Sequence, residues 1–156
     1  MPNKMNSRYQ EWNIQFEKQF KLLDLTRSII FVGWSLGALF LIKWMAELRQ
    51  SSVLHTTPLK DKYSQGDSFL QLHLVAAPLS EGDFILPKDL SDTVTFCKEI
   101  FVYHSLNDNI VPFSSTTKYL KLFNSEKVEL FSNPDQGHFL VGKIDSLIKN
   151  IKDKVG

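Results

Sequence analysis

The sequence predicts an α/β domain built on a parallel sheet of about four strands, with helices on both faces. Short runs of β-branched and aromatic residues alternate along the chain with longer segments of helical periodicity. The strand-like runs are apolar at successive positions, which is typical of parallel strands buried on both faces. A chain of 156 residues that is 43% hydrophobic can bury one such core, so we expect a single domain over 1–156.

The first half of the chain predicts two helices and two strands. The segment Tyr9–Leu23 repeats apolar residues at steps of three and four, which indicates a helix with one buried face. The run Ser28–Gly33 is typical of a strand buried on both faces, and Leu36–Gln50 of a helix that is apolar on most sides. A second buried strand, Gln71–Ala77, ends before a proline.

The second half of the chain predicts two further strands and two helices, separated by irregular segments. The strands are Glu99–His104 and Lys127–Phe131, and the helices are Phe113–Phe123 and Leu140–Ile151. Residues 51–69 and 79–97 have no regular pattern and contain glycine and proline, so we expect loops there.

Charge and composition exclude several classes of function. The balance of 18 basic and 17 acidic residues predicts no binding to nucleic acid or to an anionic membrane surface. The single cysteine, Cys97, excludes a disulfide scaffold. The uncharged stretch Ser28–Ile42 is shorter than the roughly 20 residues that cross a bilayer, and the polar start lacks a signal peptide's apolar region. We therefore expect a cytoplasmic protein.

A Gly-x-Ser-x-Gly motif follows the first predicted strand and opens the next helix. In Gly33-Trp34-Ser35-Leu36-Gly37, this context is that of a nucleophile elbow, a sharp turn that exposes a reactive serine hydroxyl. Side chains two residues either side of Ser35 would collide, which predicts the two glycines. The Leu36 N–H would lie at the helix N-terminus and face an oxyanion.

A serine nucleophile needs a base, and the base needs an acid to orient it. Asp108 follows the third predicted strand and His138 follows the fourth, so both lie at the same sheet edge as Ser35. The chain order Ser, Asp, His is that of a known catalytic triad. Asp83 and Asp135 remain alternative acids.

The other histidines are weaker candidates for a site. His73 falls in the middle of a strand and is expected to be a satisfied core residue. His104 ends a strand and would form hydrogen bonds near the site, and His55 lies in a polar loop. The sequence contains no metal-ligand spacing and no phosphate-binding glycine loop, so we expect neither a metal nor a cofactor.

The segments GWSLGA, HSLNDNIVP and DQGHF together resemble the α/β-hydrolase fold. The chain is similar over nearly its whole length to small serine hydrolases of the retinoblastoma-binding protein 9 family. That resemblance implies Ser35 as nucleophile, Asp108 as acid and His138 as base, acting on small carboxylic esters or related acyl compounds without a cofactor. Trp34 stands where such elbows more often carry histidine. We expect this difference to alter the pocket without abolishing it.

The N-terminus departs from that family, whose members begin with a strand and an oxyanion loop. No His-Gly or Gly-Gly pair precedes Ser35, so we expect a truncated three-layer hydrolase sandwich whose oxyanion hole keeps the Leu36 donor. A truncated or misplaced start is the preferred explanation. Alternatively, another chain supplies the missing elements, or a homodimer forms through the exposed sheet edge at 28–33.

Two functional hypotheses therefore remain. The first is a serine hydrolase whose small-molecule ester or acyl substrate reacts through an acyl-enzyme. The second is a catalytically weak or inactive hydrolase-fold fragment that acts as a protein-interaction module. A transferase or perhydrolase using the same residues is a less favoured third hypothesis.

Overall fold

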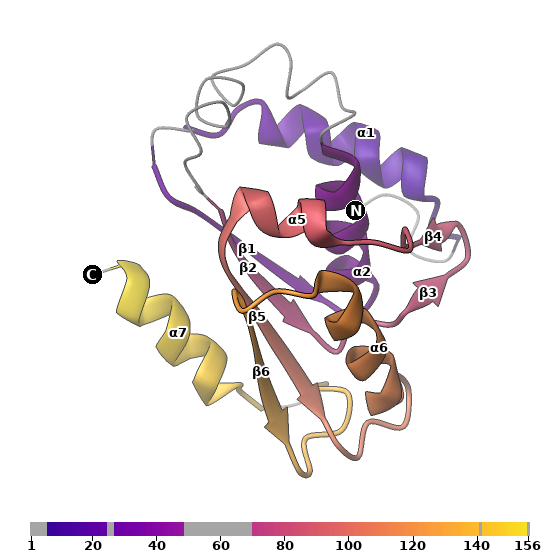
Figure 1. Ribbon diagram of the computed structural model, residues 1–156, viewed down its shortest axis with the longest axis vertical. Helices are drawn as coiled ribbons and strands as arrows, with labels where there is room; N and C mark the ends of the chain where they lie inside the picture. Colours follow the sequence, from indigo (N-terminus) through magenta and orange to yellow (C-terminus); the bar gives the residue numbers. More distant parts are fainter. Residues whose placement is uncertain (1–5, 25–26, 49–69, 141, 156) are drawn as a thin grey trace.

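A four-stranded parallel sheet forms the centre of the computed structural model, which describes residues 6–24, 27–48, 70–140 and 142–155. Its strand order is β1-β2-β5-β6, and every neighbouring pair is parallel. The strands are β1 (Ile29–Trp34), β2 (Leu70–Val75), β5 (Cys97–Ser105) and β6 (Val128–Asn133). The predicted parallel sheet is confirmed, and its carboxyl ends meet at one edge (Figure 1).

Helices cover both faces of this sheet, as predicted (Figure 1). The helices on the first face are α1 (Tyr9–Phe20), α2 (Leu36–Glu47), α5 (Ser91–Phe96) and α6 (Phe113–Phe123). There the Phe31 ring of β1 packs against Phe20 of α1 and Trp44 of α2. On the second face, α7 (Asp145–Val155) packs through Leu147 against a separate cluster on the sheet. In the described part of the chain, no helix is long and apolar enough to cross a membrane.

The second face of β1 is more exposed than the sequence predicts. Val32 and Trp34 are 50% and 47% exposed, whereas every residue of β2 is buried. The difference arises because α7 packs over β5 and β6, and β1 is the outer strand on the other side of the described sheet. The prediction of burial on both faces is therefore wrong for β1. A homodimer across its edge stays a prediction.

The segment 79–97 is more regular than expected. It contains the antiparallel pair β3 (Ser80–Glu81) and β4 (Phe84–Ile85), followed by α5. Strands of two residues are too short to produce a periodic signal in the sequence. The pair is held by Phe84, whose ring contacts those of Tyr9 and Trp12 on α1. The other predicted loop, 51–69, lies outside the described residues.

The last helix begins later than predicted, at Asp145 instead of Leu140. Leu140 is exposed and belongs to the loop between β6 and α7. That loop also carries His138, which is buried.

A close approach between β1 and α2 governs the turn that joins them. A Cβ added at Gly33 would lie 2.6 Å from the Ala38 Cα and 2.8 Å from its N, which are backbone atoms that cannot turn aside. A Cβ at Gly37 would meet nothing within 4 Å. The expectation that both glycines avoid a collision is correct for Gly33 and wrong for Gly37, because the helix leads Gly37 away from the strand.

We therefore expect opposite effects from two matched substitutions. Gly33→Ala should lower the free energy of unfolding by about 1–3 kcal/mol, because it overpacks the turn. Gly37→Ala should leave stability unchanged or raise it by up to about 1 kcal/mol, because alanine favours a helix. Urea unfolding of both variants measures the difference, and equal destabilisation would contradict this account of the turn.

His73 is a buried titratable group in the middle of β2. Its Nδ1 lies 2.9 Å from the Tyr103 hydroxyl, and its ring stacks on Phe101 at 4.9 Å between centroids. Its Nε2 has no hydrogen-bond partner among the described residues, so the expectation of a satisfied core histidine is only half met. Burial lowers the pKa of His73 to about 4, although Glu99 opposes the shift.

This histidine should make stability fall as the solution becomes acidic. Between pH 6.5 and about 4 the unfolded chain binds a proton at His73 that the folded chain does not, so the folded state loses stability. His73→Gln should remove roughly 1–3 kcal/mol of that pH dependence. Between pH 7 and 4 the unfolding free energy of the wild type should fall further than that of the variant, and parallel curves would count against this role.

Candidate active site

Ser35 occupies a strained backbone conformation at the junction of β1 and α2. Its φ and ψ angles are 52° and −123°, which a residue other than glycine rarely adopts. The Ser35 N–H donates to the Val75 carbonyl at 2.8 Å and ties the turn to β2. Leu36 is the first residue of α2, so its N–H has no partner within the helix and is available to an anion.

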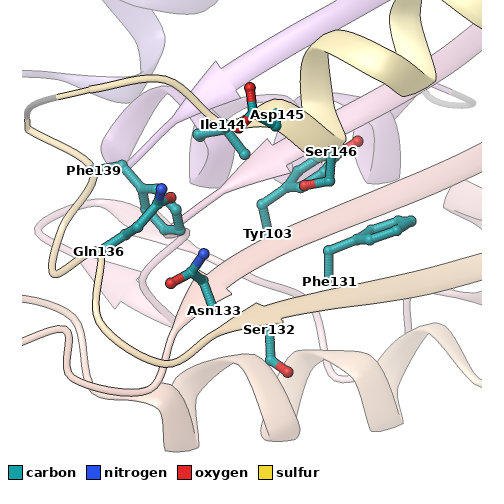
Figure 2. Close-up of a pocket in the computed structure, with 9 residues that line it drawn as sticks. All are labelled: Tyr103, Phe131, Ser132, Asn133, Gln136, Phe139, Ile144, Asp145 and Ser146. Atoms are coloured by element: carbon teal, nitrogen blue, oxygen red, sulfur yellow. The ribbon is translucent and has the colours of Figure 1, made fainter.

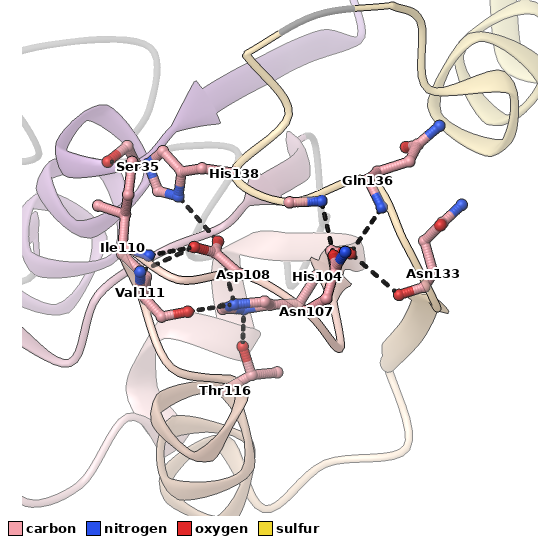
Figure 3. Close-up of polar contacts among 12 residues, drawn as sticks. Ser35, His104, Asn107, Asp108, Ile110, Val111, Thr116, Asn133, Gln136 and His138 are labelled. Atoms are coloured by element: carbon pink, nitrogen blue, oxygen red, sulfur yellow. Dashed lines mark hydrogen bonds and ion pairs between the residues drawn. The ribbon is translucent and has the colours of Figure 1, made fainter.

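His138 lies between the predicted nucleophile and the predicted acid. Its Nδ1 is 2.8 Å from Asp108 Oδ2, and its Nε2 is 2.9 Å from Ser35 Oγ (Figure 3). Because a carboxylate accepts only, Nδ1–H donates to Asp108 and Nε2 accepts from the Ser35 hydroxyl. The structure thus brings together all three residues that the sequence predicts, from three different loops.

Asp108 is fixed as an ionised acceptor. Its Oδ1 accepts hydrogen bonds from the Ile110 and Val111 N–H groups at 2.9 and 2.8 Å (Figure 3). Burial acts to raise the pKa of Asp108, but the Val111 N–H, the contact with His138 and the Ile110 N–H together hold it below its ordinary value. The carboxylate therefore stays charged opposite the imidazole.

The two alternative acids, Asp83 and Asp135, make other contacts. The Asp83 carboxylate accepts the Tyr9 N–H at 3.1 Å and so caps the start of α1. Asp135 is exposed, and its N–H donates to the Asn133 side chain at 3.1 Å. His138 Nδ1–H donates its hydrogen bond to Asp108, so Asp108 is the one of the three candidate acids that lies against the imidazole.

His104 forms a supporting layer beneath Asp108, as its position at a strand end suggested. Its Nε2–H donates to the Val111 carbonyl at 2.9 Å and lies 3.4 Å from Asp108 Oδ2. Its Nδ1 accepts from the Thr116 hydroxyl, which also contacts the Tyr119 hydroxyl at 3.0 Å. Burial lowers the pKa of His104, although Val111 and Asp108 oppose the shift, so this ring is neutral at pH 7.

Two polar residues, one at the end of β5 and one just beyond it, hold the loop that carries His138, and the sequence analysis did not predict this role. Ser105 Oγ accepts the Gln136 N–H at 2.9 Å, and Asn107 Oδ1 accepts the Gly137 N–H at 2.8 Å (Figure 3). The signal in the sequence is a serine and an asparagine just before the acid, a pattern that equally suits an ordinary turn.

A cleft of about 340 Å³ opens beside Ser35. Its walls come from the start of α2, the segment through β3, and the loop that leads into α6. The lining residues are Ser35, Leu36, Pro78, Leu79, Ser80, Glu81, Ile110, Val111, Pro112 and Ser115. Among the described residues that line the cleft, Glu81 is the one that carries an ionisable side chain.

A second pocket, of about 280 Å³, lies between the β5–β6 surface, the His138 loop and the start of α7 (Figure 2). Aromatic side chains of Tyr103, Phe131 and Phe139 line it together with the amides of Asn133 and Gln136. Ser35 is not among its lining residues. Within the described residues, no group of three or more His, Cys, Asp or Glu side chains could hold a metal.

Several solved structures, α/β hydrolases among them, share this architecture. The ydeN gene product from B. subtilis matches 98% of this chain and 78% of its own, with a TM-score of 0.73 and 18% identity. The match to mouse alpha/beta hydrolase domain-containing protein 10 covers 99% of this chain and 73% of the mouse protein, with a TM-score of 0.55 and 16% identity. The match to a Bacillus cereus carboxylesterase covers 93% of this chain and 57% of the esterase, with a TM-score of 0.51 and 15% identity. The chain therefore has the α/β-hydrolase fold.

No protein-family model and no curated protein sequence matches the chain. The structural matches support the fold and do not distinguish the retinoblastoma-binding protein 9 family from other hydrolases. That narrower resemblance stays a prediction.

We expect the reactivity of Ser35 to depend on Asp108 and not on Asp135. Asp108→Asn removes the charge that orients and stabilises His138, so fluorophosphonate labelling of Ser35 should slow by roughly 10³–10⁴-fold. Asp135→Asn should label at the wild-type rate, because the Asp135 side chain is exposed. Intact-mass time courses measure both rates, and an equal loss in the two variants would reopen the choice of acid.

Proposed function

We propose that this protein is a serine hydrolase that acts on small carboxylic esters or related acyl compounds. The observation that carries the proposal is the continuous hydrogen-bonded chain from Ser35 through His138 to Asp108, together with the cleft that Ser35 lines. The fold supports the proposal, because one solved structure with the same architecture is named a carboxylesterase, an enzyme that hydrolyses esters. The same residues would suit other acyl transfers, and the acceptor preference distinguishes them.

In the proposed reaction, Ser35 Oγ attacks the ester carbonyl carbon while His138 Nε2 takes the hydroxyl proton. The carbonyl oxygen becomes an oxyanion that the Leu36 N–H stabilises at the positive end of α2. The tetrahedral intermediate collapses, the C–O bond breaks, and His138 gives its proton to the leaving alcohol. Water then hydrolyses the acyl-enzyme through the same base, which frees the acid and restores Ser35.

The cleft supports a small substrate. Its volume of about 340 Å³ is at the lower end of the range for ligand sites, roughly 300–1,000 Å³. Leu79 and Ile110 provide apolar contact for a short acyl or alkyl group, and Ser80 and Ser115 provide hydroxyls. Every step of the reaction uses side chains and backbone of this chain, so the proposal requires no cofactor.

A fluorophosphonate probe tests the proposal directly. The purified chain should gain the mass of one phosphonyl group, and both Ser35→Ala and His138→Ala should abolish the adduct. Ser132→Ala, which removes a hydroxyl at an exposed position of β6, should label like the wild type.

The labelled protein should also hydrolyse p-nitrophenyl acetate, with the same dependence on Ser35. A folded wild-type chain that neither labels nor hydrolyses the ester would overturn the proposal and favour the interaction module.

A further inference from the structure

Trp34 makes two separate contacts with His138. It is the last residue of β1 and immediately precedes Ser35. Its indole Nε1–H donates to the His138 carbonyl at 3.0 Å. Its ring also lies beside the imidazole, with 5.3 Å between the ring centroids and 51° between the planes. A residue beside the nucleophile is therefore attached to both the backbone and the ring of the base.

These contacts complete a set of restraints on three consecutive residues. The N–H groups of Gln136 and Gly137 are held by Ser105 and Asn107 from the end of β5. The carbonyl of His138 is held by Trp34 from the end of β1. The loop is thus held from β5 on one side and from β1 on the other. The imidazole lies between Asp108 and Ser35, which follow these two strands, and contacts both.

We propose that Trp34 is a positioning residue that holds His138 where its Nε2 can accept the Ser35 proton. The inference rests on the proposed hydrolase function. Proton transfer requires the two atoms to keep a separation near the observed 2.9 Å, and a displacement of about 1 Å can cost 10²-fold in rate. The hydrogen bond to Asp108 holds Nδ1 but still allows the imidazole to rotate about that atom. The hydrogen bond from Trp34 restrains the His138 backbone that carries the ring.

This role differs from the tuning of a pocket wall that the sequence predicts for position 34. Trp34 is absent from the residues that line the cleft beside Ser35. Its loss should therefore change kcat, because proton transfer is slower, and leave KM unchanged, because the substrate contacts remain.

Two substitutions separate the two contacts. Trp34→Phe keeps a ring and removes the N–H donor, so kcat for p-nitrophenyl acetate should fall roughly 3- to 10-fold. Trp34→Ala removes both contacts, and kcat should fall roughly 10- to 100-fold. The fluorophosphonate labelling rate should fall in parallel, with KM within about twofold of wild type.

Val32→Ala is the matched control. Val32 lies two residues earlier on the same face of β1, is equally exposed, and has no hydrogen-bonding group in its side chain. It should retain wild-type kcat and KM. Thermal unfolding shows whether each variant is folded. Active-site titration counts the reactive molecules, so that kcat is calculated per reactive molecule.

Three results would overturn the role of Trp34 while the hydrolase proposal stands. They are a Trp34→Phe kcat equal to that of Val32→Ala, a raised KM with unchanged kcat, and a loss of activity explained entirely by fewer folded molecules. A wild-type chain that neither labels nor hydrolyses the ester would overturn both proposals.

Discussion

The close approach of β1 to α2 at Gly33 is the constraint on which the rest of the site depends. The Ala38 backbone lies where a side chain at Gly33 would be, so the strand can turn directly into the helix. That turn places Ser35 at a positive φ and leaves the Leu36 N–H at a helix end. A bulkier residue at Gly33 would separate strand and helix and move the hydroxyl away from His138.

The parallel sheet contributes the second requirement, because it delivers three loops to one edge. Ser35 follows β1, Asp108 follows β5, and His138 follows β6. Loops alone would hold these groups loosely. Here the Asp108 carboxylate is satisfied by two backbone N–H groups, and His104 and Thr116 fill the space beneath it. Buried polar groups that are fully paired are rigid, and this rigidity keeps the imidazole aligned.

Local patterns predicted most of the helices and strands. The helix at 113–123 is found as predicted, and the four strands agree with the structure to within a few residues. The prediction failed where regular structure is too short to repeat, as in β3 and β4, and where a run of apolar residues has fewer neighbours than its composition suggests, as at Val32. Burial depends on which helix lies above a strand, and a strand's own residues do not encode that.

The sequence by itself determined which polar groups meet at the sheet edge. A Gly-x-Ser-x-Gly turn between a strand and a helix, with Asp108 and His138 after later strands, identifies those groups because connectivity fixes the edge at which each loop emerges. Tertiary structure alone excluded Asp83 and Asp135 and attached Trp34, Ser105 and Asn107 to the His138 loop. Hydrogen bonds between residues 30 to 104 positions apart depend on ångström-scale packing of whole elements, which no local pattern specifies.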